Sequence, residues 1–182
     1  ALGDDVAVES GMLECPTRPS FTKDILPVRS ACIAYFIALQ NNLTDTELLA
    51  DIIIGSLIKD VGHSLIKHSI FEKQDDLLNN SLYLKHPMLS IYLLTKCGHE
   101  FSNDLKRIVL EHHEDSRGFG FPRGKKEEHI DIKSFIVSIA DQIIYHSASK
   151  ENKKSLTDVI RIMNKRLELP GFNINYPIKL TD

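Results

Sequence analysis

The sequence predicts an all-α protein that folds as a single bundle of about five to seven helices. Apolar residues recur three or four positions apart in several long stretches, which is the spacing of one helix face. No alternating pattern of useful length indicates a strand. The chain has 182 residues, of which 42% are hydrophobic, and this is enough for one substantial core.

The amino-terminal stretch differs from the rest of the chain. Residues 1–20 mix small, acidic and proline residues without a clear period, so we expect an arm or linker followed by one helical domain over 21–182. The domain begins with a helix over 24–40, where apolar residues recur at helical spacing. Asn41 and Asn42 are expected to end it.

The second helix is expected to be well buried. Thr44 to Glu47 has a capping-box sequence, with a hydroxyl residue three positions before a glutamate. The run from Leu48 to Val61 is mostly apolar, and Gly62 is its expected stop. Residues 63–84 are mixed and polar, which indicates a short helix between loops.

Further helices follow from proline, serine and asparagine positions. Pro87 suits the first turn of a helix that ends near Gly98. Ser102 or Asn103 is expected to cap the next helix, which runs to a pair of histidines. A loop, a strongly apolar helix and a last amphipathic helix are then expected over 115–126, 131–147 and 156–167.

Charge and cysteine content exclude several classes of protein. The net charge is −3 with a pI near 6.3, which argues against a general binder of DNA or RNA duplexes or of anionic membranes. No apolar run approaches the roughly 20 residues of a membrane span. The cysteines Cys15, Cys32 and Cys97 form no CxxC pair, so neither a zinc knuckle nor a disulfide framework is indicated. A reducing cytoplasm is the expected compartment.

Two aspartates stand in apolar helical surroundings. Asp60 follows a run of isoleucines, and Asp141 lies within the apolar helix over 131–147. A buried, unpaired carboxylate costs several kcal/mol or becomes neutral. Two such acids therefore favour a shared cation, either a metal ion or a buried lysine; the alternative is that each is half-exposed or hydrogen-bonded to a helix end.

Histidines add to this pattern. His112 and His113 end a predicted helix, and imidazole pairs suit transition metals. Adjacent helical positions point about 100° apart, so both rings reach one centre only where the helix ends. His86 precedes Pro87 at a helix start, where a capping or packing histidine is the more common case.

The loop after the histidines is suited to a phosphate ester. Its glycines allow close backbone approach, and its arginines offer planar donors for phosphate oxygens. The alternative is a charged, flexible surface loop. Two phenylalanines weigh against that alternative, because each must either pack down or stack on a ligand base. The residues in question are Arg117, Gly118, Phe119, Gly120, Phe121, Arg123 and Gly124.

Taken together, these residues resemble the HD-GYP family, the cyclic di-GMP phosphodiesterase branch of the HD metal-dependent phosphohydrolases. The long motif of that family reads HHExxDGxGYPxG, and residues 112–124 read HHEDSRGFGFPRG. The family's HDIGK segment aligns with Lys59 to His63, its HP segment with His86-Pro87, and its distal AD with Ala140-Asp141. The order agrees over about 24–167.

The resemblance implies a bundle like the HD domain that holds one transition metal ion, with iron or manganese favoured. The implied metal ligands are Asp60, His86, His112 and His113, with Asp141 kept from a second site. The implied catalytic residues are Asp60, Lys59 and His63. The implied substrate-binding residues are Arg117, Gly118, Gly120, Phe121 and Arg123.

Several family positions are replaced. The HD histidine is Lys59, and the lysine that follows the family aspartate is His63. A further metal-binding histidine is Leu26 at the best-matching position, the DG aspartate is Arg117, and the GYP tyrosine is Phe121.

The replacements leave two functions open. The first is a metal-dependent phosphodiesterase, active or weakened, for cyclic di-GMP or its linear dinucleotide, in which Lys59 serves as a fixed charge beside Asp60 and Asp141. The second is a degenerate domain that senses a cyclic dinucleotide or docks a protein partner, in which Lys59 neutralises both acids and no metal is needed. Hydrolysis of a different phosphate ester or nucleotide ranks below both.

Overall fold

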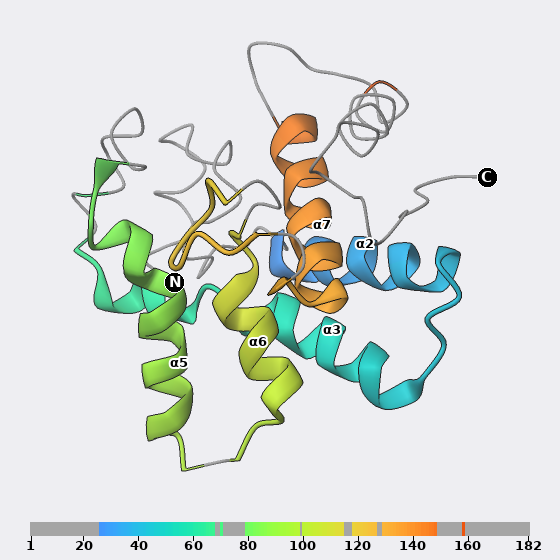
Figure 1. Ribbon diagram of the computed structural model, residues 1–182, viewed down its shortest axis with the longest axis horizontal. Coiled ribbons are helices and arrows are strands. Elements are labelled where there is room, and N and C mark those ends of the chain that lie inside the picture. Colours follow the sequence, from blue (N-terminus) through green and yellow to red (C-terminus); the bar gives the residue numbers. More distant parts are fainter. Residues whose placement is uncertain are drawn as a thin grey trace.

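The computed structural model describes residues 26–67, 70, 79–98, 100–114, 118–126, 129–148 and 158. The arm predicted over 1–20 lies outside these residues, and so does the helix predicted over 156–167 apart from Asp158. Within the described residues, the predicted all-α fold is confirmed: they form five α-helices and two short 3-10 helices, and no strand (Figure 1).

The first two helices form an antiparallel pair (Figure 1). Helix α2 spans Leu26–Gln40 and ends at the predicted asparagines, where Asn42 adopts a positive φ of 58°. Helix α3 spans Thr46–Ile58. Its N-cap is Asp45, whose carboxylate accepts a hydrogen bond from Leu48 N at 2.8 Å. The predicted capping box, with Thr44 as the cap, was therefore displaced by one residue, because the aspartate takes the capping position.

Gly62 is not the stop of the second helix. Helix α3 ends at Ile58, before the predicted Val61, and the chain continues into the 3-10 helix η2 over Val61–Leu65. Gly62 lies inside η2 and packs against α5. A Cβ atom on Gly62 would lie 2.3 Å from the carbonyl oxygen of His86, so the glycine is needed for close approach of two backbones.

The next two helices form a second hairpin (Figure 1). Helix α5 spans His86–Lys96, has Pro87 in its first turn as predicted, and follows the 3-10 helix η4 over Tyr83–Lys85. Helix α6 spans Asn103–Glu111 and is capped by Ser102, whose Oγ accepts from Leu105 N at 2.9 Å. Because the two helices are antiparallel, the start of α5 and the end of α6 lie at the same end of the hairpin.

Helix α7, over Ile132–Ala148, packs against α2, α3 and α6. The main core lies between these helices and is aliphatic, as the composition indicates. Its fully buried members are Ala34, Ala38, Ile52, Ile108, Ile136, Val137 and Ala140. Among the described residues, no helix is both long and apolar enough to span a membrane.

Candidate metal centre

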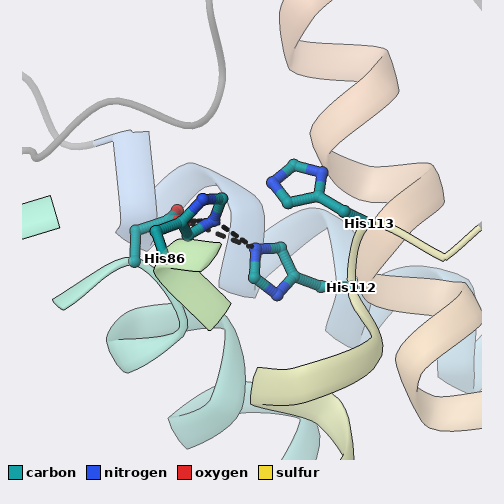
Figure 2. Close-up of side chains that lie close together, drawn as sticks. His86, His112 and His113 are labelled. Carbon is teal, nitrogen blue, oxygen red and sulfur yellow. Dashed lines mark hydrogen bonds and ion pairs between the residues drawn. The ribbon is translucent and has the colours of Figure 1, made fainter. Parts of the chain in front are cut away.

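Four potential ligands meet where the two helix hairpins join. Asp60 follows α3, His86 begins α5, and His112 and His113 follow the last residue of α6. One ligand atom from each residue lies within 4.8 Å of the others, and this group could hold a metal ion. Figure 2 shows the rings of His86 and His112 facing one another, with His113 beside them.

The hydrogen bonds of two histidines leave their Nε2 atoms free of protons. His86 Nδ1 lies 2.8 Å from the carbonyl oxygen of Tyr83, and His112 Nδ1 lies 2.8 Å from that of Val109. A carbonyl only accepts, so each Nδ1 donates and each neutral ring carries a lone pair on Nε2. Burial lowers the pKa of His86, which keeps its ring neutral. Such a bond from Nδ1 is the usual support of a metal-ligating histidine.

These two lone pairs converge with a carboxylate oxygen. The Nε2 atoms of His86 and His112 are 3.3 Å apart, and each lies 3.3 Å from Asp60 Oδ1. Asp60 Oδ1 has no partner in hydrogen-bonding geometry. Ligand atoms about 2.1 Å from one metal ion lie about 3.0 to 3.4 Å from each other. Three acceptor atoms at this spacing fit a shared cation.

His113 completes the group from the other side. Its Nε2 is buried and has no hydrogen-bond partner, and burial lowers the pKa of its ring well below the ordinary value. The ring stacks on Phe121, with centroids 4.5 Å apart and planes 24° from parallel. Phe121 therefore covers the centre on the side of the loop, where the resemblance placed it as a substrate-binding residue.

The second oxygen of Asp60 faces a buried lysine. The ammonium of Lys59 contacts Asp60 Oδ2, and it lies 3.1 Å from Asp141 Oδ2. Ser30 donates to Asp141 Oδ1 at 2.6 Å. Burial by itself would lower the pKa of Lys59, but the carboxylates of Asp141 and Asp60 outweigh burial and raise it. Lys59 is therefore a charged ammonium that joins the two predicted acids.

Asp60 remains ionised for the same reason. Burial would raise the pKa of its carboxyl group, but the ammonium of Lys59 and the two nearby imidazoles hold that pKa well below its usual range. Asp141 lies apart from the four potential ligands and shares the ammonium with Asp60. The lysine, rather than a common metal ion, is what links the two carboxylates.

Ser90 locks the lysine segment against α5, and the sequence offered no signal for it. Its Oγ donates to the carbonyl oxygen of Lys59 at 2.6 Å and accepts from Gly62 N at 2.8 Å. Ser90 lies one helical turn after His86 and is fully buried. This pair of hydrogen bonds sets Asp60 and His86 at a fixed separation.

Glu114 anchors the loop that follows the histidines. Its buried carboxylate accepts from Arg123 N at 2.8 Å and from Lys125 N at 2.7 Å. Glu111 adds a second anchor, because its Oε1 accepts from Lys125 Nζ at 2.6 Å. The HHE motif contains Glu114, yet its role depends on backbone groups far along the loop, which no spacing rule identifies.

The remaining predicted residues are placed as follows. Gly118 has a positive φ of 84°, and Arg123 is exposed on the same loop as Gly120. Arg117 lies outside the described residues. His63 is buried in η2, with its ring 4.1 Å from that of His86, and it does not belong to the group of four potential ligands.

Replacing Glu114 by glutamine is expected to destabilise the domain by about 1–3 kcal/mol, because an amide nitrogen cannot accept from the two loop N–H groups. Urea unfolding followed by circular dichroism measures this change. Glu100→Gln, at an exposed position, is the matched control and should stay within about 0.5 kcal/mol of the unmodified chain. Equal effects of the two substitutions would contradict the anchoring role.

Comparison with known proteins agrees with the fold and with the donor set. The family model described as HD domain matches residues 22–168. The chain is also 29% identical, over 115 residues, to the cyclic di-GMP phosphodiesterase response regulator RpfG of Xanthomonas campestris pv. campestris (strain 8004). That match covers 62% of this chain but spans only 30% of the relative's length. Since the family model covers well over half of the sequence, the chain belongs to the HD domain family.

Proposed function

We propose that this chain is a phosphodiesterase domain that works with one transition metal ion, iron or manganese, and hydrolyses cyclic di-GMP or its linear dinucleotide. The observation that carries the proposal is the convergence of Asp60 Oδ1 with two unprotonated imidazole nitrogens, 3.3 Å from each other and from it. The similarity to RpfG, a cyclic di-GMP phosphodiesterase, supports this choice of substrate.

A bound transition metal would supply a Lewis acid that polarises a phosphoryl oxygen and makes water more acidic. The residues that would hold it are Asp60, His86, His112 and His113. Lys59 holds the other oxygen of Asp60, so the carboxylate keeps its direction and its charge. Phe121 excludes water from the face of His113, and the exposed Arg123 offers a guanidinium to a phosphate of the substrate.

One observation favours a second candidate, a domain that binds a dinucleotide or a protein without hydrolysis. The ammonium of Lys59 already balances the buried carboxylates of Asp60 and Asp141, so the fold does not depend on a metal ion for their neutralisation. In addition, Phe121 has no hydroxyl group with which to contact a leaving oxygen. The two candidates differ in turnover and in metal content.

Metal analysis is the first test. The protein, purified without chelators, is expected to hold about one iron or manganese ion per chain, since a His₃Asp donor set suits these metals. His112→Ala and His113→Ala should each remove most of it, whereas His129→Ala, at an exposed position, should not. A metal content near zero that does not respond to these substitutions would refute the metal centre.

Turnover is the second test. Metal-loaded protein should cleave cyclic di-GMP, and Asp60→Asn or His112→Ala should reduce the rate by about 100-fold or more, because removing a ligand costs at least as much as removing its support. Circular dichroism checks that each variant is folded. If the protein holds metal and binds the dinucleotide but never cleaves it, the second candidate replaces the first.

A further inference from the structure

We propose that Phe119 is a stacking platform for a purine base of the bound dinucleotide. The inference rests on the proposed function and adds to it a residue that determines specificity. It is carried by the contrast between two phenylalanines of one loop, by the glycines around Phe119, and by the anchoring of that loop beside the metal centre.

The two phenylalanines of the loop have opposite environments. Phe121 packs down, with its ring 4.5 Å from His113 and 6.0 Å from Tyr83. Phe119 is 83% exposed, the highest exposure of any large hydrophobic side chain in the described residues. Since Phe121 already meets the packing needs of the loop, the ring of Phe119 remains available to a ligand.

Glycines on both sides leave the ring of Phe119 accessible. Gly118 and Gly120 have no side chains that could cover either of its faces. Gly118 has a φ of 84°, a conformation that larger residues adopt only with strain. The backbone at this point therefore favours a bare neighbour for the aromatic ring, which is the arrangement that stacking of a flat base requires.

The loop holds Phe119 close to the metal centre. Phe121 N donates to the carbonyl oxygen of His113 at 3.1 Å, and Glu114 accepts from the N–H groups of Arg123 and Lys125. The Cα atom of Phe119 is thus at most about 7.6 Å from that of Phe121, which covers the potential ligand His113. A base joined through ribose to a phosphate at the centre can reach that distance. Because the loop is anchored, little ordering cost remains for binding.

The charge on the loop agrees with a nucleotide. Arg123 is exposed on the same anchored loop and offers a guanidinium to phosphate. An aromatic face combined with a nearby cation is the common way in which proteins hold unpaired nucleotides. A cyclic dinucleotide presents both features, because it carries flat purines next to its phosphates.

The test uses the manganese-loaded protein and a phosphorothioate analogue of cyclic di-GMP that resists hydrolysis, with calorimetry as the readout. Phe119→Ala should weaken binding on the order of 10-fold, the effect of losing one stacked base. Phe119→Tyr should bind within about twofold of the unmodified chain, since the aromatic face is kept. Phe36→Ala is the control, because Phe36 is also exposed, at 64%, but lies on α2.

The absence of tryptophan provides a second readout. Phe119→Trp makes an indole the only tryptophan fluorophore, and a stacked guanine should quench its emission as the analogue is added. Phe36→Trp should bind equally well without quenching. Unchanged affinity in Phe119→Ala, or an unquenched Phe119→Trp that binds, would overturn the stacking role alone. Failure of the unmodified chain to bind the analogue would overturn the proposed substrate as well.

Discussion

Lys59→Ala is expected to lower the free energy of unfolding by about 3–5 kcal/mol, the cost of removing one partner from a buried ion pair. The side chain of Lys59 is only 3% exposed, and its ammonium contacts Asp60 and lies 3.1 Å from Asp141. Without it, two carboxylates stay buried, with a hydroxyl from Ser30 as the printed hydrogen-bond donor to Asp141. Urea unfolding of metal-free protein measures the loss, so that no bound cation offsets it.

The control for this substitution is Lys106→Ala, at an exposed position on α6, with an expected change within about 0.5 kcal/mol. A double-mutant cycle with Asp141→Asn sharpens the test. The pair of substitutions should cost less than the sum of the two single ones, because the second removes a charge that the first left unpaired. Additive losses would show that Lys59 and Asp141 do not interact in solution.

Gly62→Ala is expected to destabilise the domain by about 3 kcal/mol or more, at the upper end of overpacking effects. The added Cβ would lie 2.3 Å from the carbonyl oxygen of His86 and 2.5 Å from Ser90 N. Both are backbone atoms of α5, so relief requires the whole helix to shift, and His86 would shift with it. The variant should therefore lose metal as well as stability, as measured by thermal unfolding and metal analysis.

Two other glycines calibrate the effect. In Gly55→Ala the new Cβ meets only the side chain of Ile108, at 2.6 Å from its Cγ2, and that side chain can adjust at a smaller cost. Gly98→Asn should be nearly neutral, because Gly98 follows α5 in open space with a φ of 71°, which asparagine tolerates. If Gly62→Ala proves as stable as Gly98→Asn, the close contact between η2 and α5 is wrong.

Local sequence patterns predicted most of the described fold. The spacing of apolar residues predicted α2, α5, α6 and α7, and Pro87 and Ser102 marked helix starts where the structure has them. The end of α3 was predicted too late. A glycine that follows an apolar run looks like a helix stop, and the sequence does not reveal that Gly62 faces another backbone.

The sequence by itself determined that this chain is helical and which residues could hold a metal: Asp60, His86, His112 and His113 are polar groups in apolar or helix-end positions, and such positions are visible in a linear pattern. The tertiary structure alone decided how these groups are arranged. The antiparallel packing of α5 and α6 brings two Nε2 atoms within 3.3 Å, and a side chain from α7 gives Lys59 its second carboxylate. The hydrogen bonds of Ser90 and Glu114 likewise join residues far apart in the chain, and long-range contacts of this kind leave no periodic signal in a sequence.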